Sequence, residues 1–338
     1  MIDVLQAFPL PSFVVAPNEI ITAINSKAED LLGQTTKGRH YLRSIRSPDV
    51  ADAIDYVLQN GGDRQTRWLT TISEIDLTYM VFVSGIEEGA ALVSLEDTSH
   101  VETSRKMRRD FVTNVSHELK TPLTSMLGFL ETLQTTAQTD PVAQQRFLEI
   151  MTNEAKRMNR LVDDLLSLNR VESEERTKPA ESVDLNALLI ATKENLSPLN
   201  EKTNTQIKLT LPDEQIEIAG HSDQLTQVIV NLIENAIKYG GSDKDIMVNL
   251  GPVDYQSTLR CDGVCLSVTD FGPGIERSHI PRLTERFYRI DHHRSREIGG
   301  TGLGLSIVKH IINRHRGRLK VTSEIGFGST FSVFLPKS

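Results

Sequence analysis

The sequence predicts a multidomain α+β protein with a small N-terminal α/β module, a two-helix hairpin and a C-terminal block that alternates helix and strand. The chain has 338 residues, more than one typical domain, and its 38% hydrophobic and 24% charged residues are a globular composition. The spacing of apolar residues changes near residues 100 and 180, which separates the three parts. We expect domains at 1–98, 99–175 and 180–338.

The charge balance and the cysteine content limit which partners and which cellular compartment are expected. With Lys+Arg 37 and Asp+Glu 45 the net charge is −8, which argues against nucleic acid or an anionic membrane as the main partner. Two cysteines cannot build a disulfide framework and suit a reducing compartment. No stretch offers the ~20 apolar residues of a membrane helix, and the start lacks the basic region of a signal peptide. We therefore expect a soluble, cytoplasmic chain without a membrane span.

Short apolar runs separated by turn residues predict one sheet in the N-terminal module. The first two strands are expected on either side of the turn pair Pro17-Asn18. Strands are predicted at Ser12–Ala16, Ile20–Ile24, Arg67–Ser73, Leu77–Val83 and Ala90–Leu95, and helices at Lys27–Leu32 and Val50–Leu58. Two strands, short helices and three further strands make a small α/β module.

From residue 100 on, apolar residues recur every three or four positions, which predicts two long amphipathic helices. One apolar seam runs from Met107 to Leu133 and the second from Phe147 to Leu165, with a break at 135–141. The short connection predicts an antiparallel hairpin. Because one hairpin cannot cover both stripes, we expect a homodimer in which two hairpins form a four-helix bundle.

The first of these helices carries Ser-His-Glu-Leu-Lys-Thr-Pro-Leu at 116–123, with His117 on the face away from the seam. An exposed histidine is usually an ordinary surface residue, but three neighbours favour chemistry here. Glu118 can accept the proton of one ring nitrogen and leave the other as a nucleophile. Thr121 lies one turn further on the same side, and Pro122 can bend the helix beside the site.

A predicted helix in the C-terminal block aligns three polar side chains. Asn231, Asn235 and Lys238 stand at i, i+4 and i+7 on a helix otherwise rich in Leu, Ile and Val. Solvated or capping residues are the ordinary interpretation of asparagine on a helix. Three aligned polar groups instead favour a hydrated Mg²⁺ and the phosphates that it carries.

Two glycine-containing segments follow. At the end of a strand, Asp270-Phe271-Gly272-Pro273-Gly274 lets a flat ligand approach while the carboxylate accepts an exocyclic amine, although this pattern is often a plain turn. The loop at 299–306 opens a helix, and its backbone N–H groups suit phosphate. It is not a Rossmann loop, because the third glycine would fall on Leu305, nor a P-loop. Arginines at 286, 289, 294 and 296 predict a mobile basic lid.

In this order the signals resemble a two-component sensor histidine kinase over about residues 100–338. Residues 116–123 match the phosphoacceptor box, 231–239 the N box, 270–274 and 300–304 the glycine boxes, and 285–289 the phenylalanine box. Thr284 stands where the family usually has a second phenylalanine, so looser lid packing is expected. The resemblance implies an ATP-binding α/β sandwich of the Bergerat (GHKL) type and protein-histidine kinase activity.

The resemblance also implies roles for single residues. His117 would be phosphorylated, Asn235 would ligate Mg²⁺, and Asp270 would hold the adenine amino group. Tyr239 would pack near the adenine, while Lys238 and Arg289 would contact the phosphates. The remaining residues of the ATP site would be Asn231, Gly272, Gly274, Tyr288, Gly300, Gly302, Gly304 and Leu305.

The implied reaction has two steps. ATP·Mg²⁺ supplies its γ-phosphoryl group to His117 while Glu118 takes or orients the ring proton. The group then passes to an aspartate in the receiver domain of a separate response regulator docked on the bundle. Thr121 is expected to position water for the reverse dephosphorylation of that regulator.

The N-terminal module resembles a PAS sensor domain in its strand order and its closing Glu96-Asp97-Thr98. Together with these boxes, it is most similar to the phosphate-regulon branch of the sensor kinases, so a phosphate-starvation response is expected. Members of that branch usually carry membrane helices. The chain is therefore expected to be a soluble variant or a cytosolic portion.

Two other classes of protein share parts of this pattern. A chaperone or topoisomerase ATPase of the same nucleotide-binding fold would carry a water-activating glutamate at Asn231 and would lack the box around His117. A non-catalytic scaffold would be expected to have lost Asn235, Asp270 or the glycines. The sequence has neither pattern, which favours the kinase.

Overall fold

The computed structural model describes residues 2–72, 75–135, 140–197, 205–241, 244–290 and 300–337. By its internal contacts the chain divides into two compact units, residues 1–113 and 114–338. The division falls within the long helix α4 (Ser99–Gln134). The second unit thus contains most of the hairpin together with the C-terminal block.

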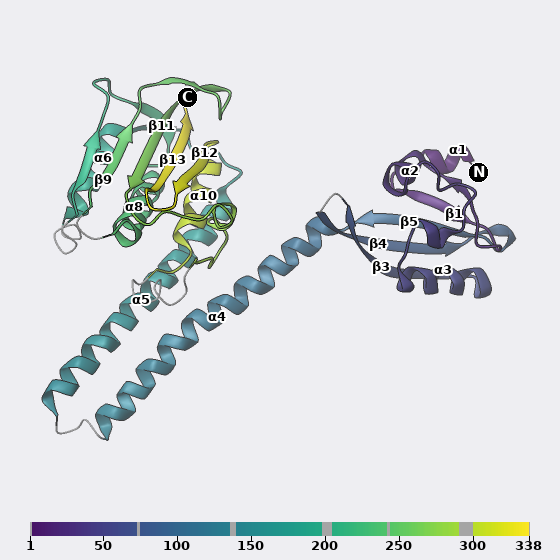
Figure 1. Ribbon diagram of the computed structural model, residues 1–338, viewed down its shortest axis with the longest axis horizontal. Helices are drawn as coiled ribbons and strands as arrows, with labels where there is room; N and C mark the ends of the chain where they lie inside the picture. The colour runs from purple at the N-terminus through teal and green to yellow at the C-terminus, as the bar shows by residue number, and fades with distance from the viewer. Residues whose placement is uncertain are drawn as a thin grey trace. The chain divides into compact units, whose positions relative to one another are not determined.

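A five-stranded antiparallel sheet with the order β2-β1-β5-β4-β3 builds the N-terminal unit (Figure 1). Its strands are β1 (Ser12–Val15), β2 (Ile21–Ile24), β3 (Asp63–Ile72), β4 (Ile75–Gly85) and β5 (Ala91–Asp97), and its helices are α1 (Ile2–Gln6), α2 (Ser26–Leu32) and α3 (Pro48–Asn60). On β4 the buried Tyr79, Val81 and Val83 follow the two-residue period of a strand with one face in the core.

The predicted strands and helices of this module occur in the predicted order, and their ends differ by a few residues. Strand β3 begins at Asp63, before the predicted Arg67. The cause is the pair Gly61 and Gly62, which both have positive φ (68° and 79°) and turn the chain directly from α3 into β3. The predicted end of β3 at Ser73 lies outside the described residues.

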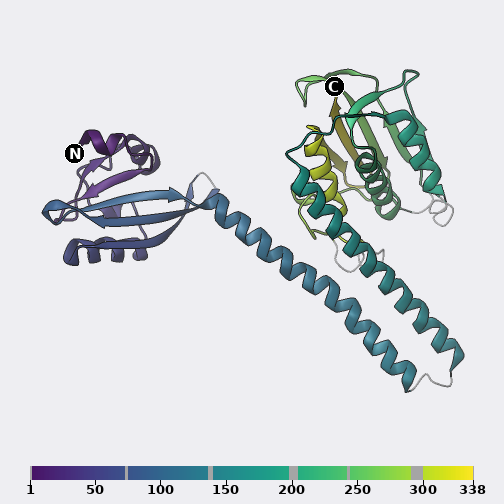
Figure 2. The ribbon, with the colours of Figure 1, turned by 180° about the vertical axis from the view of Figure 1, so that it is seen from behind.

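Helix α4 from residue 114 and helix α5 (Pro141–Glu174) lie side by side and antiparallel, as the two apolar seams predict (Figures 1 and 2). The Asp140 carboxylate caps α5 by accepting the amide N–H groups of Val142 and Ala143. The rings of Phe129 and Phe147 stack between the helices, 5.2 Å apart. None of the helices in the described ranges combines the length and the apolar character needed to cross a bilayer.

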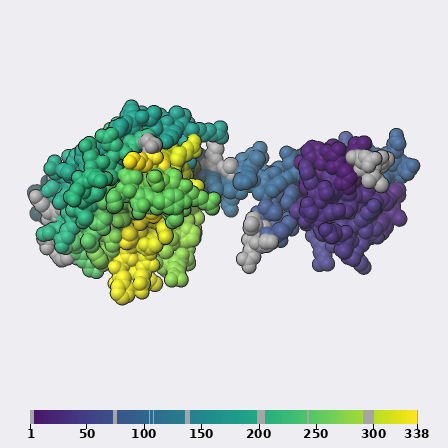
Figure 3. All heavy atoms as spheres, turned by 90° about the horizontal axis from the view of Figure 1, so that it is seen from above, coloured from purple at the N-terminus to yellow at the C-terminus, as the bar shows by residue number. Residues whose placement is uncertain are grey.

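The C-terminal block is a two-layer α/β sandwich. Its main sheet has the order β12-β13-β11-β9-β7, with β10 beside β11, and β6 and β8 form a separate pair. The strands are β6 (Glu181–Asp184), β7 (Ile207–Thr210), β8 (Glu217–Gly220), β9 (Ile246–Leu250), β10 (Asp254–Gln256), β11 (Cys261–Asp270), β12 (Arg318–Glu324) and β13 (Gly328–Pro336). In Figure 3 the yellow C-terminal strands lie against the green segment that includes β11.

Helices α6 (Leu185–Asn195), α8 (Ser222–Tyr239) and α10 (Gly304–Arg314) form a layer over one face of this sheet (Figure 2). Helix α8 buries Leu225, Val228, Ile229, Leu232 and Ala236, whose spacing of i, i+3, i+4, i+7 and i+11 places them on one face of the helix. This apolar stripe attaches α8 to the core. The polar residues lie on the opposite face of α8, where they are available to line a cavity.

A buried histidine ends α10. The side chain of His315 is 1% exposed in the core, its Nδ1–H donates to the Ile311 carbonyl at 2.8 Å, and its Nε2 accepts the His221 N–H at 3.0 Å. The second bond requires a neutral ring. Burial is the main cause that lowers the pKa of His315 below its ordinary value.

We expect acid to destabilise the C-terminal unit through His315. The neutral ring is favoured in the folded state, so the stabilisation is complete above the unfolded pKa of about 6.5 and is lost as the pH falls below it. In His315→Gln, which keeps a donor and an acceptor, the free energy of unfolding should depend less on pH between about 7 and 5. Urea unfolding at several pH values measures this slope. The exposed His100→Gln is the control and should keep the original slope; equal slopes in all three proteins would contradict the assignment.

Candidate functional site

A cavity of about 460 Å³ lies where helix α8, the end of β11, the loop before α10 and one face of α5 meet. Most of the residues predicted to bind nucleotide line it. They are Asn231, Asn235, Lys238, Tyr239, Asp270, Gly274, Tyr288, Arg289, Gly300, Gly302, Gly304 and Leu305. Segments from residue 231 to residue 305 thus converge on one cavity.

The polar face of α8 forms one wall of the cavity. Asn231, Asn235 and Lys238 all line it, at the spacing that predicted a shared face. Glu234 lies in the same stripe and accepts the Lys238 ammonium at 2.6 Å. The wall therefore presents amide oxygens, a carboxylate and a cation side by side.

Asp270 stands at the end of β11 and is 6% exposed. Its Oδ1 accepts the Gly272 N–H at 2.9 Å. Burial raises the pKa of Asp270, against the opposing effects of the Gly272 and Ser329 amides and of Lys244. A buried carboxylate of this kind offers a strong acceptor to an N–H group of a ligand.

Gly272 was predicted to bind the ligand, but it does not line the cavity. A Cβ built on Gly272 would lie 2.5 Å from the Tyr239 carbonyl oxygen and 2.9 Å from Asp270 Oδ1. The absence of a side chain at this position therefore lets two backbone segments pack and leaves the Asp270 carboxylate room, whereas Gly274 lines the cavity as predicted.

The glycine loop before α10 is held by the phenylalanine box. Gly302 has a φ of +76°, and a Cβ there would lie 2.9 Å from the Phe287 Cα. The Phe287 N–H donates to the Gly302 carbonyl at 2.8 Å, and Phe287 itself has a positive φ of 62°. The hydrogen bond between these two positive-φ residues joins the phenylalanine box to the glycine loop. Arg294 and Arg296 of the predicted lid lie outside the described residues.

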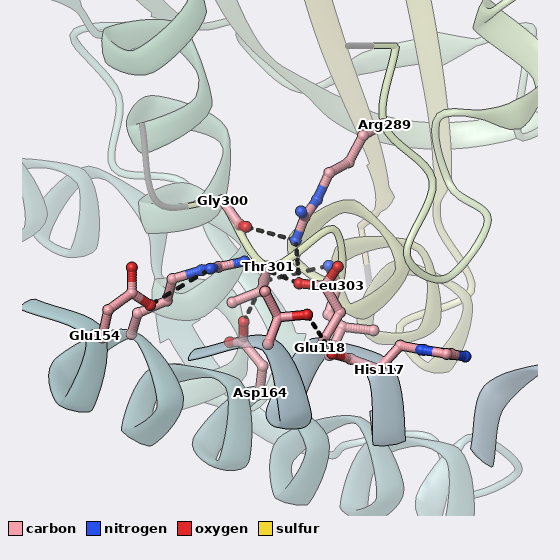
Figure 4. Close-up of polar contacts among 10 residues, drawn as sticks. His117, Glu118, Glu154, Asp164, Arg289, Gly300, Thr301 and Leu303 are labelled. Atoms are coloured by element: carbon pink, nitrogen blue, oxygen red, sulfur yellow. Dashed lines mark hydrogen bonds and ion pairs between the residues drawn. The ribbon is translucent and has the colours of Figure 1, made fainter. Parts of the chain in front are cut away.

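Arg289 is a buried cation at the edge of the cavity, with 4% of its side chain exposed. Its Nη2 donates to the Gly300 carbonyl at 2.7 Å and to Glu118 Oε2 at 3.3 Å (Figure 4). Nε and Nη1 are buried and have no hydrogen-bond partner among the described residues. Burial lowers the pKa of Arg289, and the nearby Glu118 acts in the opposite direction. Two unsatisfied donors on a buried guanidinium suit an anionic ligand.

The phosphoacceptor segment is only partly connected to this cavity. Glu118 Oε2 accepts the Arg157 guanidinium at 2.9 Å as well as Arg289. His117 and Thr121 are exposed, and the Thr121 hydroxyl donates to the His117 carbonyl at 3.0 Å. Figure 4 shows the His117 ring pointing away from Arg289. Of the three predicted catalytic residues, the structure brings Glu118 into contact with Arg289 of the cavity lining and leaves the other two on the surface of α4.

Helix α5 contributes residues that the sequence analysis did not single out. Arg160, Asp163 and Asp164 line the cavity, and Asp164 Oδ2 accepts the Thr301 hydroxyl at 2.6 Å. Polar residues are expected on the outer positions of any amphipathic helix, so no local signal distinguished these three. Only the packing of α5 against the sandwich reveals them.

The donor groups of the cavity fit a magnesium ion that arrives with a nucleotide. Within the described ranges, no group of three or more His, Cys, Asp or Glu side chains is placed to hold a metal. Mg²⁺ needs only one or two protein oxygens when phosphates and water supply the rest. Asn235 and Glu234 offer such oxygens.

Two family models match the chain. The "His Kinase A (phospho-acceptor) domain" matches residues 107–174, and the "Histidine kinase-, DNA gyrase B-, and HSP90-like ATPase" matches residues 220–338. The first covers the hairpin with His117, and the second covers the sandwich and its cavity.

Solved structures show the same fold. The histidine kinase ThkA, in a complex with the response regulator protein TrrA, is 21% identical with a TM-score of 0.55 and covers 99% of this chain and 98% of its own. The Acinetobacter baumannii histidine kinase AdeS is 24% identical with a TM-score of 0.51 over 66% of this chain and 98% of its own.

Curated relatives extend the match along the chain. The phosphate regulon sensor protein PhoR of Pseudomonas aeruginosa is 36% identical over 312 residues, which are 91% of this chain and 68% of PhoR. A sensor protein kinase WalK of Staphylococcus aureus is 36% identical over 325 residues, 94% of this chain and 75% of that protein. The chain spans half the length of the Staphylococcus saprophyticus WalK. With relatives of this identity and coverage, the chain belongs to the two-component sensor histidine kinases and is a protein-histidine kinase with an ATP-binding domain.

Proposed function

We propose that this kinase transfers the γ-phosphoryl group of ATP to His117 and then to an aspartate of a response regulator. One observation carries the proposal. Arg289 belongs to the lining of the cavity, has two buried donors without a partner among the described residues, and is bonded to Glu118, the residue next to His117. A single side chain thereby links the proposed phosphate site to the proposed phosphoacceptor segment.

The cavity suggests how ATP would be held. Asp270 would accept the adenine amino group beside Tyr239, at the end of β11. Lys238, Arg289 and the N–H groups that open α10 would hold the phosphates. Asn235, with Asn231 beside it on α8, would hold Mg²⁺, which neutralises phosphate charge during transfer.

The chemical step would need no activated side chain beyond a correctly placed imidazole. One neutral ring nitrogen of His117 attacks the γ-phosphorus, the bond to the bridging oxygen breaks, and ADP leaves. Glu118 takes or orients the proton on the other ring nitrogen. Because the His117 ring points away from Arg289 in Figure 4, the reaction requires a rearrangement that brings the ring to the γ-phosphate.

Exposed apolar side chains on the hairpin support a homodimer. Within one chain, α4 and α5 leave large hydrophobic residues open to solvent, among them Leu123, Leu127, Leu130, Leu148, Val162 and Leu166. They recur at helical spacing, and a second hairpin would cover them. The ThkA complex with TrrA supports a response regulator as a second partner of the kinase.

We further propose a sensor role for the PAS-like module and a response to phosphate starvation. The support for the phosphate response is the 36% identity to PhoR. The WalK of Staphylococcus aureus has the same 36% identity to this chain. The proposed kinase chemistry does not depend on which stimulus the module detects.

The first prediction concerns the phosphoacceptor. His117→Gln should bind ATP as the original chain does but acquire no acid-labile, alkali-stable label from γ-labelled ATP, since the amide is not a nucleophile of this kind. His100→Gln, on the same helix and exposed, should label normally. Full labelling of His117→Gln would mean that another residue accepts the phosphoryl group.

The second prediction concerns the adenine. Asp270→Asn should weaken ATP binding about 10- to 100-fold, because an amide that presents a donor leaves the adenine amine unmatched. GTP should compete poorly with ATP for the original chain, since its carbonyl offers no donor. Calorimetric titration measures both effects. Asp254→Asn, on an exposed strand, is the control; if Asp270→Asn binds ATP equally well, Asp270 is only a turn residue.

The third prediction separates two activities. Thr121→Ala should keep autophosphorylation within a few-fold but lose most phosphatase activity toward the phosphorylated regulator, because its hydroxyl does not titrate yet can hold a water. Both rates are measured on one preparation. Thr132→Ala removes the same kind of bond to a carbonyl one turn back, that of Gly128, and should keep both activities. Loss of labelling with retained dephosphorylation in Thr121→Ala would refute the role.

A further inference from the structure

Helix α5 places a carboxylate at the phosphate end of the cavity. Asp164 Oδ2 accepts the Thr301 hydroxyl at 2.6 Å, and the Thr301 oxygen in turn accepts the Leu303 N–H at 3.3 Å (Figure 4). Gly304 then begins α10. The Asp164 carboxylate is therefore one hydroxyl away from the N–H groups that are suited to a phosphate.

The charges around Asp164 are those expected around a bound phosphate. Burial raises the pKa of Asp164, while the Thr301 hydroxyl, Lys238 and Arg160 favour its charged form and Glu234 opposes it. Lys238 is also one of the two cations proposed to hold the triphosphate. A bound phosphate at this place would repel the Asp164 carboxylate, and both anions would compete for the same cation, Lys238.

Asp164 reaches the cavity only because α5 is docked on the sandwich. A row of contacts from the same half of α5, and from Glu175 directly after it, contributes to this docking. Ser167 donates to Gln227 at 2.9 Å, Glu172 pairs with Arg286, Glu174 pairs with Arg314 at 2.7 Å, and Glu175 bonds His310 at 2.8 Å. Two of these contacts are ion pairs between a carboxylate and a guanidinium, and the same half of α5 also buries Leu168 and Val171, so the docked surface combines polar with apolar contacts.

We propose that Asp164 is a built-in anion that takes the place of nucleotide phosphate, so that docking of the sandwich on α5 and binding of ATP oppose one another. The inference rests on the proposed nucleotide site. By thermodynamic linkage the effect is reciprocal: nucleotide loosens the docked arrangement as much as docking weakens nucleotide binding. Loading with ATP thereby frees the sandwich for the rearrangement that His117 requires.

The first test measures binding. Asp164→Asn removes the charge but keeps an acceptor for Thr301, and it should bind a non-hydrolysable ATP analogue at least about fivefold more tightly, the lower end of typical coupling between sites. Adenosine, which has no phosphates, should bind Asp164→Asn and the original chain equally. Glu149→Gln removes a charge elsewhere on α5, where the carboxylate is exposed, is bonded by Gln145 and does not line the cavity. Its gain should be at most about twofold.

The second test measures docking in the full-length chain. Cysteines at Glu175 and His310, whose side chains touch across the docked surface, are introduced with Cys261→Ser and Cys265→Ser. A short bifunctional thiol reagent should join them in the absence of nucleotide. The ATP analogue should slow this cross-linking and adenosine should not, and adding Asp164→Asn should slow it without nucleotide.

The outcomes separate this inference from the proposed function. If the original chain binds no adenine nucleotide, the proposed ATP site is wrong. If it binds and Asp164→Asn leaves the affinity unchanged or lowers it, Asp164 is a structural residue or helps to hold the ligand, and the antagonism is refuted. Tighter binding with cross-linking that ignores nucleotide would refute the link to docking.

Discussion

The burial of one guanidinium governs the architecture of the site. Arg289 is almost fully enclosed, so its charge has to be balanced by partners inside the protein or by a ligand. It binds a carbonyl of the glycine loop and a carboxylate of α4, and within the part of the chain that the structure describes two of its donors have no partner. The glycine loop, the phenylalanine box and α4 are thus tied together by the electrostatic requirement of a single side chain.

Helix α8 serves both the core and the site. Its apolar stripe packs against the sheet, and the polar residues on its other side line the cavity. The same helix anchors the sandwich and presents the predicted ligands for Mg²⁺ and phosphate. Because one face of α8 is buried against the sheet, the polar side chains on its other face are held in fixed positions. Electrostatic catalysis requires such fixed positions.

The surface between α5 and the sandwich has a different character. It combines ion pairs between long side chains, such as Glu172 with Arg286 and Glu174 with Arg314, with the buried apolar residues Leu168 and Val171 of α5. Partly exposed ion pairs stabilise a contact weakly and exchange readily with water. Domains joined in this way are suited to move relative to one another, and the proposed reaction requires such a movement because the His117 ring points away from Arg289.

Local patterns in the sequence determined much of this protein. The alternation and spacing of apolar residues predicted the sheets, the long hairpin and the buried stripe of α8, because the periods of strands and helices are set by backbone geometry. The boxes predicted which residues gather at the cavity. Only the tertiary structure decided that Gly272 serves packing, that Arg289 joins Glu118, and that Asp164 enters the cavity from α5. Each of these depends on a contact between segments far apart in the chain, and a contact of that kind leaves no period or spacing in the sequence.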